Sequence, residues 1–499
     1  MNSSDAPDTA GAIVVGSGPN GLAAAVTLAR AGLPVHVIEG AATPGGGCRT
    51  EELTLPGFRH DVCSAVHPLA GASPFFTGTD LAAHGVRLLT PKVAFAQPLD
   101  GGRAAAARGS VDETAGGLGP DGRAYRQLLG PLVHDVPLIL PAILAPLRTV
   151  PGHPAAMARF GLEGLLPASV LSRRFRGEEA RALIAGAAAH AMLPLTAPLT
   201  SAFGLLFLMI AHSVGWPVVE GGSARLTDAL VAEITSLGGR VETGRWVQTL
   251  DDLPQARAVL LDVSPRQFIA LAGDRLPARQ RRALERFRYG PGVCKVDWAL
   301  SGPVPWQAPA CREAGTVHLG GTFAEVARSE SDVAAGRHPG HPFCLVAQPG
   351  VVDPSRAPDG QQTLWGYCHV PSGSTVDMTD RIEAQIERFA PGFRDLILAK
   401  SVRTAAAMEQ HNPNYIGGDI SGGAGTLCQT IFRPAPQWNP YRTALPGVYL
   451  CSASTPPGGG VHGMCGAWAA RTALADLGVR QGPLTGDSAR PPPDTAGSR

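Results

Sequence analysis

The opening of the chain alternates between apolar runs and a glycine-rich turn. Residues 12–16 and 34–40 are short apolar runs, and residues 17–21 are rich in glycine. Residues 22–32 carry apolar side chains at helical spacing. Short apolar runs bounded by glycine indicate buried strands, and helical spacing indicates a helix. The opening therefore predicts a βαβ unit.

The pattern changes twice along the remaining chain. After residue 80 it consists of apolar segments broken by proline and glycine, with helical patches such as residues 178–191. Helix and strand patterns return after residue 217, and strand-like runs then alternate with a helix at residues 380–389. We therefore expect an α/β fold with a Rossmann-type cofactor domain and an inserted α+β substrate domain. The expected division is residues 11–80, 217–275 and 446–480 for the cofactor domain, 81–216 and 276–445 for the substrate-binding domain, and 1–10 and 481–499 for disordered tails.

Size and charge narrow the functional classes. The chain has 499 residues, a formal net charge of +1 and an isoelectric point near 7.7. This length suits two connected domains with room to bury a large cofactor. The near-neutral charge gives no electrostatic basis for binding nucleic acid.

The cysteines and the N-terminal segment indicate the cellular compartment in which we expect the protein. The nine cysteines form no Cys-x-x-Cys pair, which excludes a zinc ribbon and a dithiol redox centre, and we expect no metal. Residues 1–10 lack the basic start and apolar core of a secretory signal, so we expect a cytoplasmic protein. The longest apolar stretch, residues 136–147, is shorter than the about 20 residues that a membrane-spanning helix needs. It leaves peripheral membrane contact open.

The first motif with chemical meaning is the turn of the predicted βαβ unit, which reads Gly16-Ser17-Gly18-Pro19-Asn20-Gly21. In a dinucleotide-binding turn, Gly16 permits the tight turn, Gly18 lets the backbone approach a pyrophosphate, and Gly21 allows close packing of helix on strand. The helix N-terminus adds free N–H groups and positive potential. Glu39 ends the second strand, where a carboxylate accepts ribose hydroxyls.

The stretch that follows Glu39 distinguishes FAD from NAD. It reads Pro44-Gly45-Gly46-Gly47-Cys48-Arg49-Thr50 and resembles the second cofactor signature of the flavin amine oxidase and phytoene desaturase superfamily. The resemblance implies that this run passes over the pyrophosphate toward the isoalloxazine, with Arg49 at the phosphates. It also implies the fold type of flavoproteins with two dinucleotide-binding domains.

A third cofactor segment lies near the C-terminus. A predicted strand at residues 448–451 leads to a run that reads Pro457-Gly458-Gly459-Gly460-Val461-His462-Gly463. By the same resemblance, Gly459, Gly460 and Val461 form the turn that contacts the flavin ring. The helix after it points its N-terminus at the edge of the ring that becomes negative on reduction, which favours oxidation of a substrate.

Further matches extend the resemblance over most of the chain. They include residues 56–61, 216–223, 295–298 and 412–419, and they are most similar to the phytoene dehydrogenase-related branch of pyridine nucleotide-disulphide oxidoreductase domain proteins. The sequence lacks both a paired-cysteine motif and a second G-x-G-x-x-G unit. We therefore expect non-covalently bound FAD without a separate NAD(P)H domain, and oxygen or a quinone as the electron acceptor.

Three residues are candidates for catalysis. Lys295 shares one face of a buried-looking strand with Asp297, and the family resemblance implies that it holds a water against the flavin. An ion pair of Lys295 with Asp297 is the alternative. His67 and His462 lie in segments expected near the flavin, where each would act as an acid or base, or as a hydrogen-bonded structural residue.

These observations favour an FAD-dependent oxidoreductase of the desaturase or dehydrogenase type, acting on an apolar or amphipathic small molecule. The apolar composition of the inserted segment favours an apolar substrate pocket. Amine oxidation, redox-neutral isomerisation or cyclisation, and a non-enzymatic role with structural FAD are the alternatives. A homodimer and the identity of the substrate stay open.

Overall fold

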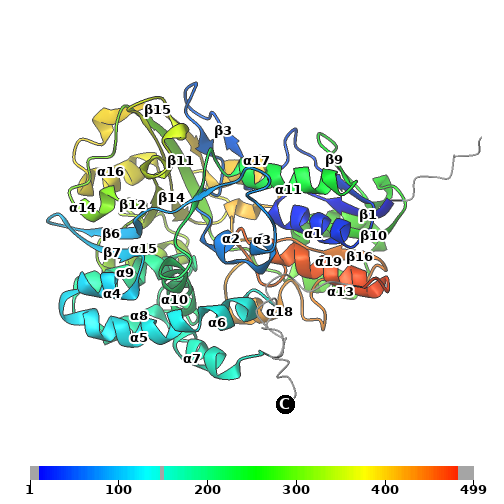
Figure 1. The fold of residues 1–499 in the computed structure, drawn as a ribbon, viewed down its shortest axis with the longest axis horizontal. Helices are drawn as coiled ribbons and strands as arrows, with labels where there is room; N and C mark the ends of the chain where they lie inside the picture. Colours follow the sequence, from blue (N-terminus) through cyan, green and yellow to red (C-terminus); the bar gives the residue numbers. More distant parts are fainter. Residues whose placement is uncertain (1–9, 147–150, 481–499) are drawn as a thin grey trace, which may run out of the picture.

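Two β-sheets lie side by side in the computed structural model, which describes residues 10–146 and 151–480 (Figure 1). The predicted tails at residues 1–9 and 481–499 lie outside the described residues, and residue 10 already belongs to the first strand. The five-stranded sheet and its helices form one half of the molecule. The seven-stranded sheet and a group of helices form the other.

The five-stranded sheet is entirely parallel and has the order β16-β10-β1-β2-β9. Its strands are β1 (Ala10–Val15), β2 (Val35–Ile38), β9 (Arg240–Glu242), β10 (Ala256–Leu261) and β16 (Val448–Leu450). Three distant parts of the sequence therefore build one sheet. This sheet confirms the predicted Rossmann-type α/β class.

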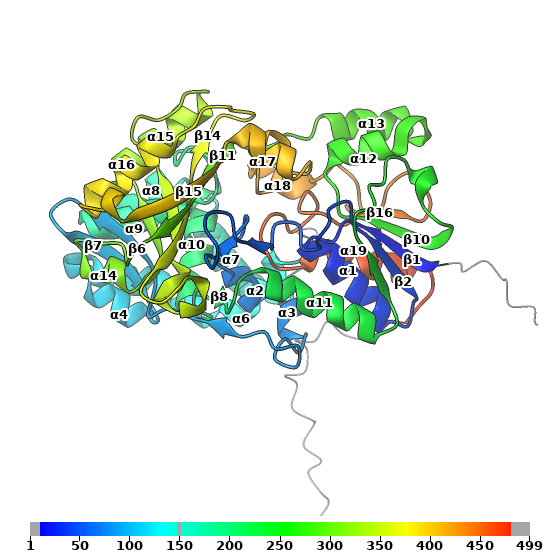
Figure 2. The same ribbon diagram turned by 90° about the horizontal axis from the view of Figure 1, so that it is seen from above.

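Helices cover both faces of this sheet. Along β1, Ala12 and Val14 face the helices α1 (Pro19–Arg30), α11 (Ala224–Ser236) and α19 (Met464–Asp476). The alternate residues Ile13 and Val15 pack on the opposite face with α12 (Pro265–Ala272) and α13 (Ala278–Glu285). Figure 2 shows these two helices on the other side of the sheet from α1 and α11. This alternation follows from the two-residue period of a strand. Although the sequence-based division assigns residue 276 onward to the substrate domain, α13 still packs against the cofactor sheet.

The seven-stranded sheet is mixed and has the order β15-β11-β14-β13-β12-β6-β7. Its strands are β6 (Val93–Leu99), β7 (Arg103–Arg108), β11 (Gly292–Leu300), β12 (Ala314–Leu319), β13 (Cys344–Ala347), β14 (Gln362–Val370) and β15 (Ile397–Arg403). On β11, Cys294, Val296 and Trp298 face the core that contains α16 (Thr379–Phe389). Lys295 and Asp297 take the alternate positions on the opposite face, as predicted.

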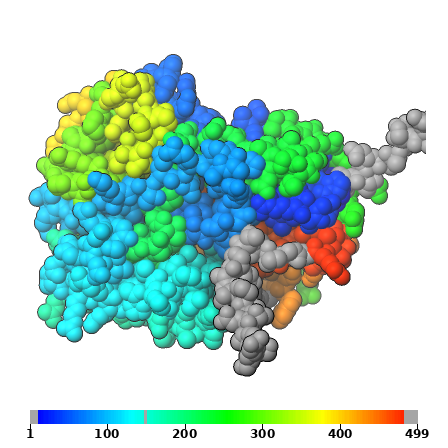
Figure 3. Space-filling view, in the orientation of Figure 1, coloured from blue at the N-terminus to red at the C-terminus, as the bar shows by residue number. Residues whose placement is uncertain are grey.

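A layer of helices, drawn in cyan and green in Figure 1, packs beneath the seven-stranded sheet. It comprises α4 (Val111–Gly116), α5 (Gly122–His134), α6 (Val136–Ile143), α7 (Pro154–Gly164), α8 (Ala168–Leu171), α9 (Glu178–Ala189) and α10 (Thr200–Ala211). In the space-filling view the cyan helices form the lower left surface (Figure 3). Among the described residues, none of the helices combines the length and apolar character needed to cross a bilayer.

Candidate cofactor and substrate site

A cavity of about 920 Å³ extends from the cofactor sheet to the helical layer. It begins where β1, β10 and β16 end side by side, because parallel strands that pair in register bring their carboxyl ends to one edge. It continues past the glycine turn before α19 and ends among side chains of α7 and α10. One cavity thus touches all three predicted cofactor segments.

Most of the predicted cofactor residues line this cavity. They are Gly16, Gly18, Pro19, Asn20, Glu39, Gly46, Gly47, Arg49, Gly459, Gly460 and Val461. The three other predicted residues do not line the cavity and lie behind its wall: Gly21, Gly45 and Thr50. A side chain at Gly21 would come within 2.2 Å of the Gly16 carbonyl oxygen, so Gly21 permits close packing. The Thr50 hydroxyl donates to Asp61 (2.9 Å) and accepts from the Ala224 N–H.

Glu39 is fixed at the end of β2 beside the cavity. Its carboxylate accepts hydrogen bonds from the backbone N–H of Ser17 (2.8 Å), the Ser17 hydroxyl (2.6 Å) and the Ala41 N–H (2.8 Å). Arg49 Nη2 lies 3.8 Å from Oε1 of the same carboxylate. The acid predicted to meet a ribose is therefore held in place by the glycine-rich turn itself.

Asp262 is an acid at this edge that sequence reasoning missed. It follows β10 directly, and its Oδ2 accepts the Gly21 N–H at 2.9 Å, at the first turn of α1. Burial, and secondarily the charge of Glu39, raises the pKa of Asp262 to about 7, against the lowering effect of the N–H groups of Gly21 and Gly18. Its place at the carboxyl end of a central parallel strand is a signal that could have identified it.

The cofactor end of the cavity contains buried polar atoms that lack partners within the described chain. Arg49 Nε and Asn20 Oδ1 are both of this kind. Buried polar groups of this type need hydrogen-bond partners. The Arg49 guanidinium and the N-terminus of α1 are groups that bind a pyrophosphate, and Asn20 Oδ1 can accept a hydrogen bond from a hydroxyl, so the residues present fit a dinucleotide. Trp246, which packs over Gly40 and also lines the cavity, was not foreseen.

The glycine turn before α19 depends on His462. Gly460 has a φ of +119° and Gly463, which caps α19, has a φ of +68°, conformations that favour glycine. The His462 ring spans the turn: Nδ1 accepts the Met464 N–H (3.0 Å), and Nε2 lies 3.1 Å from the Gly458 carbonyl oxygen. Burial lowers the pKa of His462 to about 4. Both ring nitrogens are thus engaged, and His462 positions the turn.

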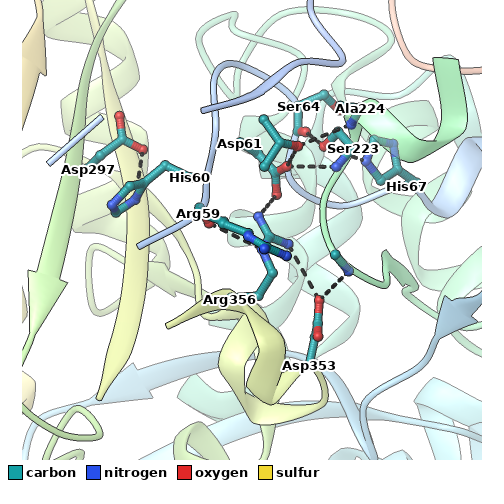
Figure 4. Close-up of polar contacts among 12 residues, drawn as sticks. Arg59, His60, Asp61, Ser64, His67, Ser223, Ala224, Asp297, Asp353 and Arg356 are labelled. Carbon is teal, nitrogen blue, oxygen red and sulfur yellow. Dashed lines mark hydrogen bonds and ion pairs between the residues drawn. The ribbon is translucent and has the colours of Figure 1, made fainter. Parts of the chain in front are cut away.

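His67 begins a chain of buried polar contacts (Figure 4). Its Nε2 lies 3.1 Å from the Ser223 hydroxyl, which donates to the Ser64 carbonyl and therefore accepts from His67. His67 lines the cavity, and its Nδ1 has no partner within the described chain. Burial lowers its pKa to about 4, so the ring is neutral at pH 7. A neutral imidazole with a free lone pair can accept a proton.

The same network continues away from the cavity. The Ser223 N–H donates to Asp61 (2.8 Å), and Asp61 also binds Arg356 Nη2 at 2.6 Å (Figure 4). The Arg356 guanidinium, in turn, lies 3.9 Å from Asp353. All three charged side chains are buried. This network joins the segment after Arg49 to the seven-stranded half of the molecule.

Lys295 is buried on β11 and forms an ion pair with Asp297, the alternative that the sequence left open. Burial lowers the pKa of Lys295 and raises the pKa of Asp297. His60 Nδ1 lies 3.7 Å from the same aspartate (Figure 4). Lys295 Nζ lies 5.6 Å from the centre of the Trp365 ring, which lines the cavity, but Lys295 itself does not line it. Lys295 therefore lies one layer behind the wall.

Two further polar residues and one aromatic pair occur in the wall. His411 and Tyr415 both line the cavity. Trp365 and Tyr367 line it from β14, with ring centres 5.3 Å apart and planes at 89°. Their rings are perpendicular neighbours on one strand, so they do not form the two facing rings of an amine-binding cage.

Comparison with known proteins agrees with this geometry. The NAD(P)-binding Rossmann-like domain family matches residues 14–76. The pyridine nucleotide-disulfide oxidoreductase domain-containing protein 2 of Rattus norvegicus is 26% identical over 558 aligned positions, which cover 93% of each chain. The 4,4'-diapolycopen-4-al dehydrogenase of Metabacillus indicus is 37% identical over 131 positions, which cover 25% of this chain and 26% of the relative.

Solved structures share the fold at low sequence identity. A putrescine oxidase variant superposes with a TM-score of 0.61 at 19% identity, covering 95% of this chain and 99% of its own. The cyclohexylamine oxidase of Brevibacterium oxydans gives a TM-score of 0.57 at 16% identity, covering 94% of this chain and 100% of its own. Together with the Rossmann sheet and the converging motifs, these likenesses agree with the predicted resemblance. The chain is similar to oxidoreductases of the phytoene desaturase and flavin amine oxidase superfamily.

Proposed function

We propose that this protein binds FAD non-covalently and oxidises an apolar or amphipathic small molecule by removing a hydride from carbon. The observation that carries the proposal is the continuity of the cavity. It joins the dinucleotide motifs to an end lined by Phe160, Phe207 and Trp216. Cofactor and substrate would therefore share one enclosed space, as a direct hydride transfer requires.

Different residues of the chain would hold different parts of the cofactor. The N-terminus of α1 and Arg49 would hold the pyrophosphate, while Glu39 would hold the ribose of the adenosine. The N-terminus of α19 would stabilise negative charge on the flavin ring. When bound, FAD accepts a hydride and so supplies the oxidising power.

The proton and the electrons also need acceptors. Removal of a hydride from one substrate carbon and a proton from its neighbour leaves a new double bond. We assign the proton to His67, whose neutral ring has an Nδ1 without a partner among the described residues. The two electrons would pass to oxygen or a quinone.

Charge in the wall favours an apolar substrate over an amine. Asp419 lines the cavity, but its carboxylate already accepts the N–H groups of Gly290 (2.7 Å), Ser421 (2.7 Å) and Gly423 (2.8 Å). The other lining acids, Glu39 and Asp262, lie at the cofactor end. Among the lining residues that the structure describes, a cationic amine therefore meets no available carboxylate beside the aromatic side chains. Amine oxidation remains the second candidate because solved amine oxidases share the fold.

Anaerobic mixing of the FAD-loaded protein with panels of apolar alcohols, polyenes and amines tests the proposal. Bleaching of the oxidised flavin band by an apolar compound supports it, and bleaching by amines alone supports the alternative. Product formation without bleaching would indicate isomerisation. The His67→Gln variant should slow flavin reduction at least tenfold with FAD still bound. The exposed His134→Gln variant is the matched control and should reduce at the wild-type rate.

A further inference from the structure

A pair of histidines lies at the end of the cavity away from the cofactor motifs. His190 follows α9, lines the cavity and is partly buried, while His318 on β12 is fully buried behind it. Their Nε2 atoms are 3.0 Å apart, so one ring donates a hydrogen bond to the other. This is the one hydrogen bond of the His190 ring within residues 10–146 and 151–480. Its second ring nitrogen is therefore available to another partner.

The surroundings of His190 are apolar. Its ring lies 4.5 Å from that of Phe207 and 6.3 Å from that of Trp216. The Trp216 N–H points away and donates to Thr316 Oγ1 at 2.9 Å, which leaves only carbon atoms of Trp216 for the cavity. Neighbouring lining residues of the same hydrophobic cluster are Phe160, Ala202 and Leu206. His190 is thus the polar group that this apolar end offers.

The histidine pair carries no charge at neutral pH. Burial, and secondarily the nearby His369, lowers the pKa of His190 to about 3. Burial also lowers the pKa of His318 well below its ordinary value. A neutral imidazole carries no charge to compensate a buried carboxylate or ammonium ion, but it satisfies an uncharged polar group with one hydrogen bond, so an uncharged ligand costs less to bury here. Among the described residues, no group of three or more His, Cys, Asp or Glu side chains is placed to hold a metal ion.

We infer that His190, held in place by His318, is a recognition site for an uncharged oxygen, a hydroxyl or carbonyl, on an otherwise apolar substrate. This inference rests on the proposed function and specifies its substrate class. An apolar molecule with one such oxygen would bury its hydrocarbon against Phe207 and Trp216 and direct its oxygen to His190. A hydrocarbon without the oxygen would leave a buried imidazole nitrogen unsatisfied, which weakens its binding.

Titration calorimetry of the FAD-loaded protein with four ten-carbon probes tests this site. Decanol and decanal carry an uncharged oxygen, chlorodecane carries none, and decanoate is an anion. We expect decanol and decanal to bind about tenfold more tightly than chlorodecane, the loss expected for one hydrogen bond. The His190→Leu variant should abolish this difference, weakening decanol and decanal and binding chlorodecane at least as tightly as the wild type, because no imidazole nitrogen is left unsatisfied.

Two further variants keep the test specific. His411→Leu removes another cavity histidine and should preserve the preference for decanol. His318→Gln should weaken the preference without abolishing it, because His318 positions His190 and does not touch the probe. Equal binding of decanol and chlorodecane, tightest binding of decanoate, or a preference that survives in His190→Leu would overturn the inference. Failure of the protein to take up FAD would instead overturn the proposed function. The two failures can be told apart because the same titration can also be carried out on the protein as purified, without added FAD.

Discussion

Gly21 donates its backbone N–H to the carboxylate of Asp262 at 2.9 Å, so a carboxylate of the protein contacts the first turn of helix α1. Gly21 is the last glycine of the turn, and Asp262 directly follows the neighbouring strand β10. Their contact explains why the carboxyl is both buried and close to the proposed pyrophosphate position. We therefore expect cofactor binding to depend on the ionisation of Asp262.

We predict that FAD binding weakens as the pH rises through about 7. The pKa of Asp262 is about 7, so the group is neutral below this pH and negative above it. A negative carboxylate there opposes the phosphates of FAD and competes for the same N–H groups. Fluorescence titration of the apoprotein from pH 6 to 9 should show a rising dissociation constant. Asp262→Asn should bind FAD with little pH dependence, and an unchanged pH profile in this variant would refute the explanation.

Arg49 should contribute strongly to FAD affinity. Its buried Nε has no partner in the described chain, and a phosphate would satisfy it. We expect Arg49→Met to raise the dissociation constant of FAD about tenfold or more, the loss of one charge-assisted hydrogen bond. Arg87→Met is the control, because the Arg87 side chain is 70% exposed and pairs with Glu220. Equal FAD affinity of the two variants would contradict the placement of Arg49.

The ion pair of Lys295 with Asp297 should matter first for stability. Lys295→Met leaves a buried carboxyl without its partner, which costs about 3–5 kcal/mol of unfolding free energy. The double variant Lys295→Met/Asp297→Leu removes both charges and should recover most of this loss. Urea unfolding followed by fluorescence measures both. If the single variant is as stable as the wild type, the pair does not exist as described.

Acid should begin to destabilise the protein at a pH above the range in which most carboxylates titrate. The pKa values of His67, His212 and His462 are lowered by burial to about 4, below the ordinary value of 6.5. The unfolded chain therefore binds more protons between these values, and stability is lost as the pH falls from about 6.5 to 4. The melting temperature should fall steadily over this interval. A melting temperature that is constant between pH 7 and 5 would show that these rings are not buried as neutral groups.

The cofactor half could be predicted from sequence because its motifs are local and restrict the backbone. Gly16, Gly21 and Gly460 stand where a side chain would clash or where φ is positive, and such positions are visible in a single sequence. In the other half of the molecule, the two-residue period of a strand also predicted correctly that Lys295 and Asp297 share one face of β11 and that Val296 lies on the opposite face. These predictions needed only neighbours along the chain.

The substrate half could not be predicted because its contacts join distant segments. His190 and His318 meet only because α9 packs under β12, and neither residue has a local motif. Asp61 and Arg356 are likewise joined by the tertiary fold. The sequence left two roles open for His462, an acid or base and a hydrogen-bonded structural residue, and only the folded turn shows that both its ring nitrogens are engaged. Apolar periodicity indicates that such helices exist, but not what they bring together.

The most direct test of the account is the identity and stoichiometry of the bound cofactor. The protein should be purified, its visible spectrum recorded, and the chromophore released by denaturation and identified by chromatography. We predict a yellow protein that releases one FAD per chain without proteolysis, or a colourless one that acquires the flavin spectrum on incubation with FAD. A protein that stays colourless with excess FAD would contradict the central claim.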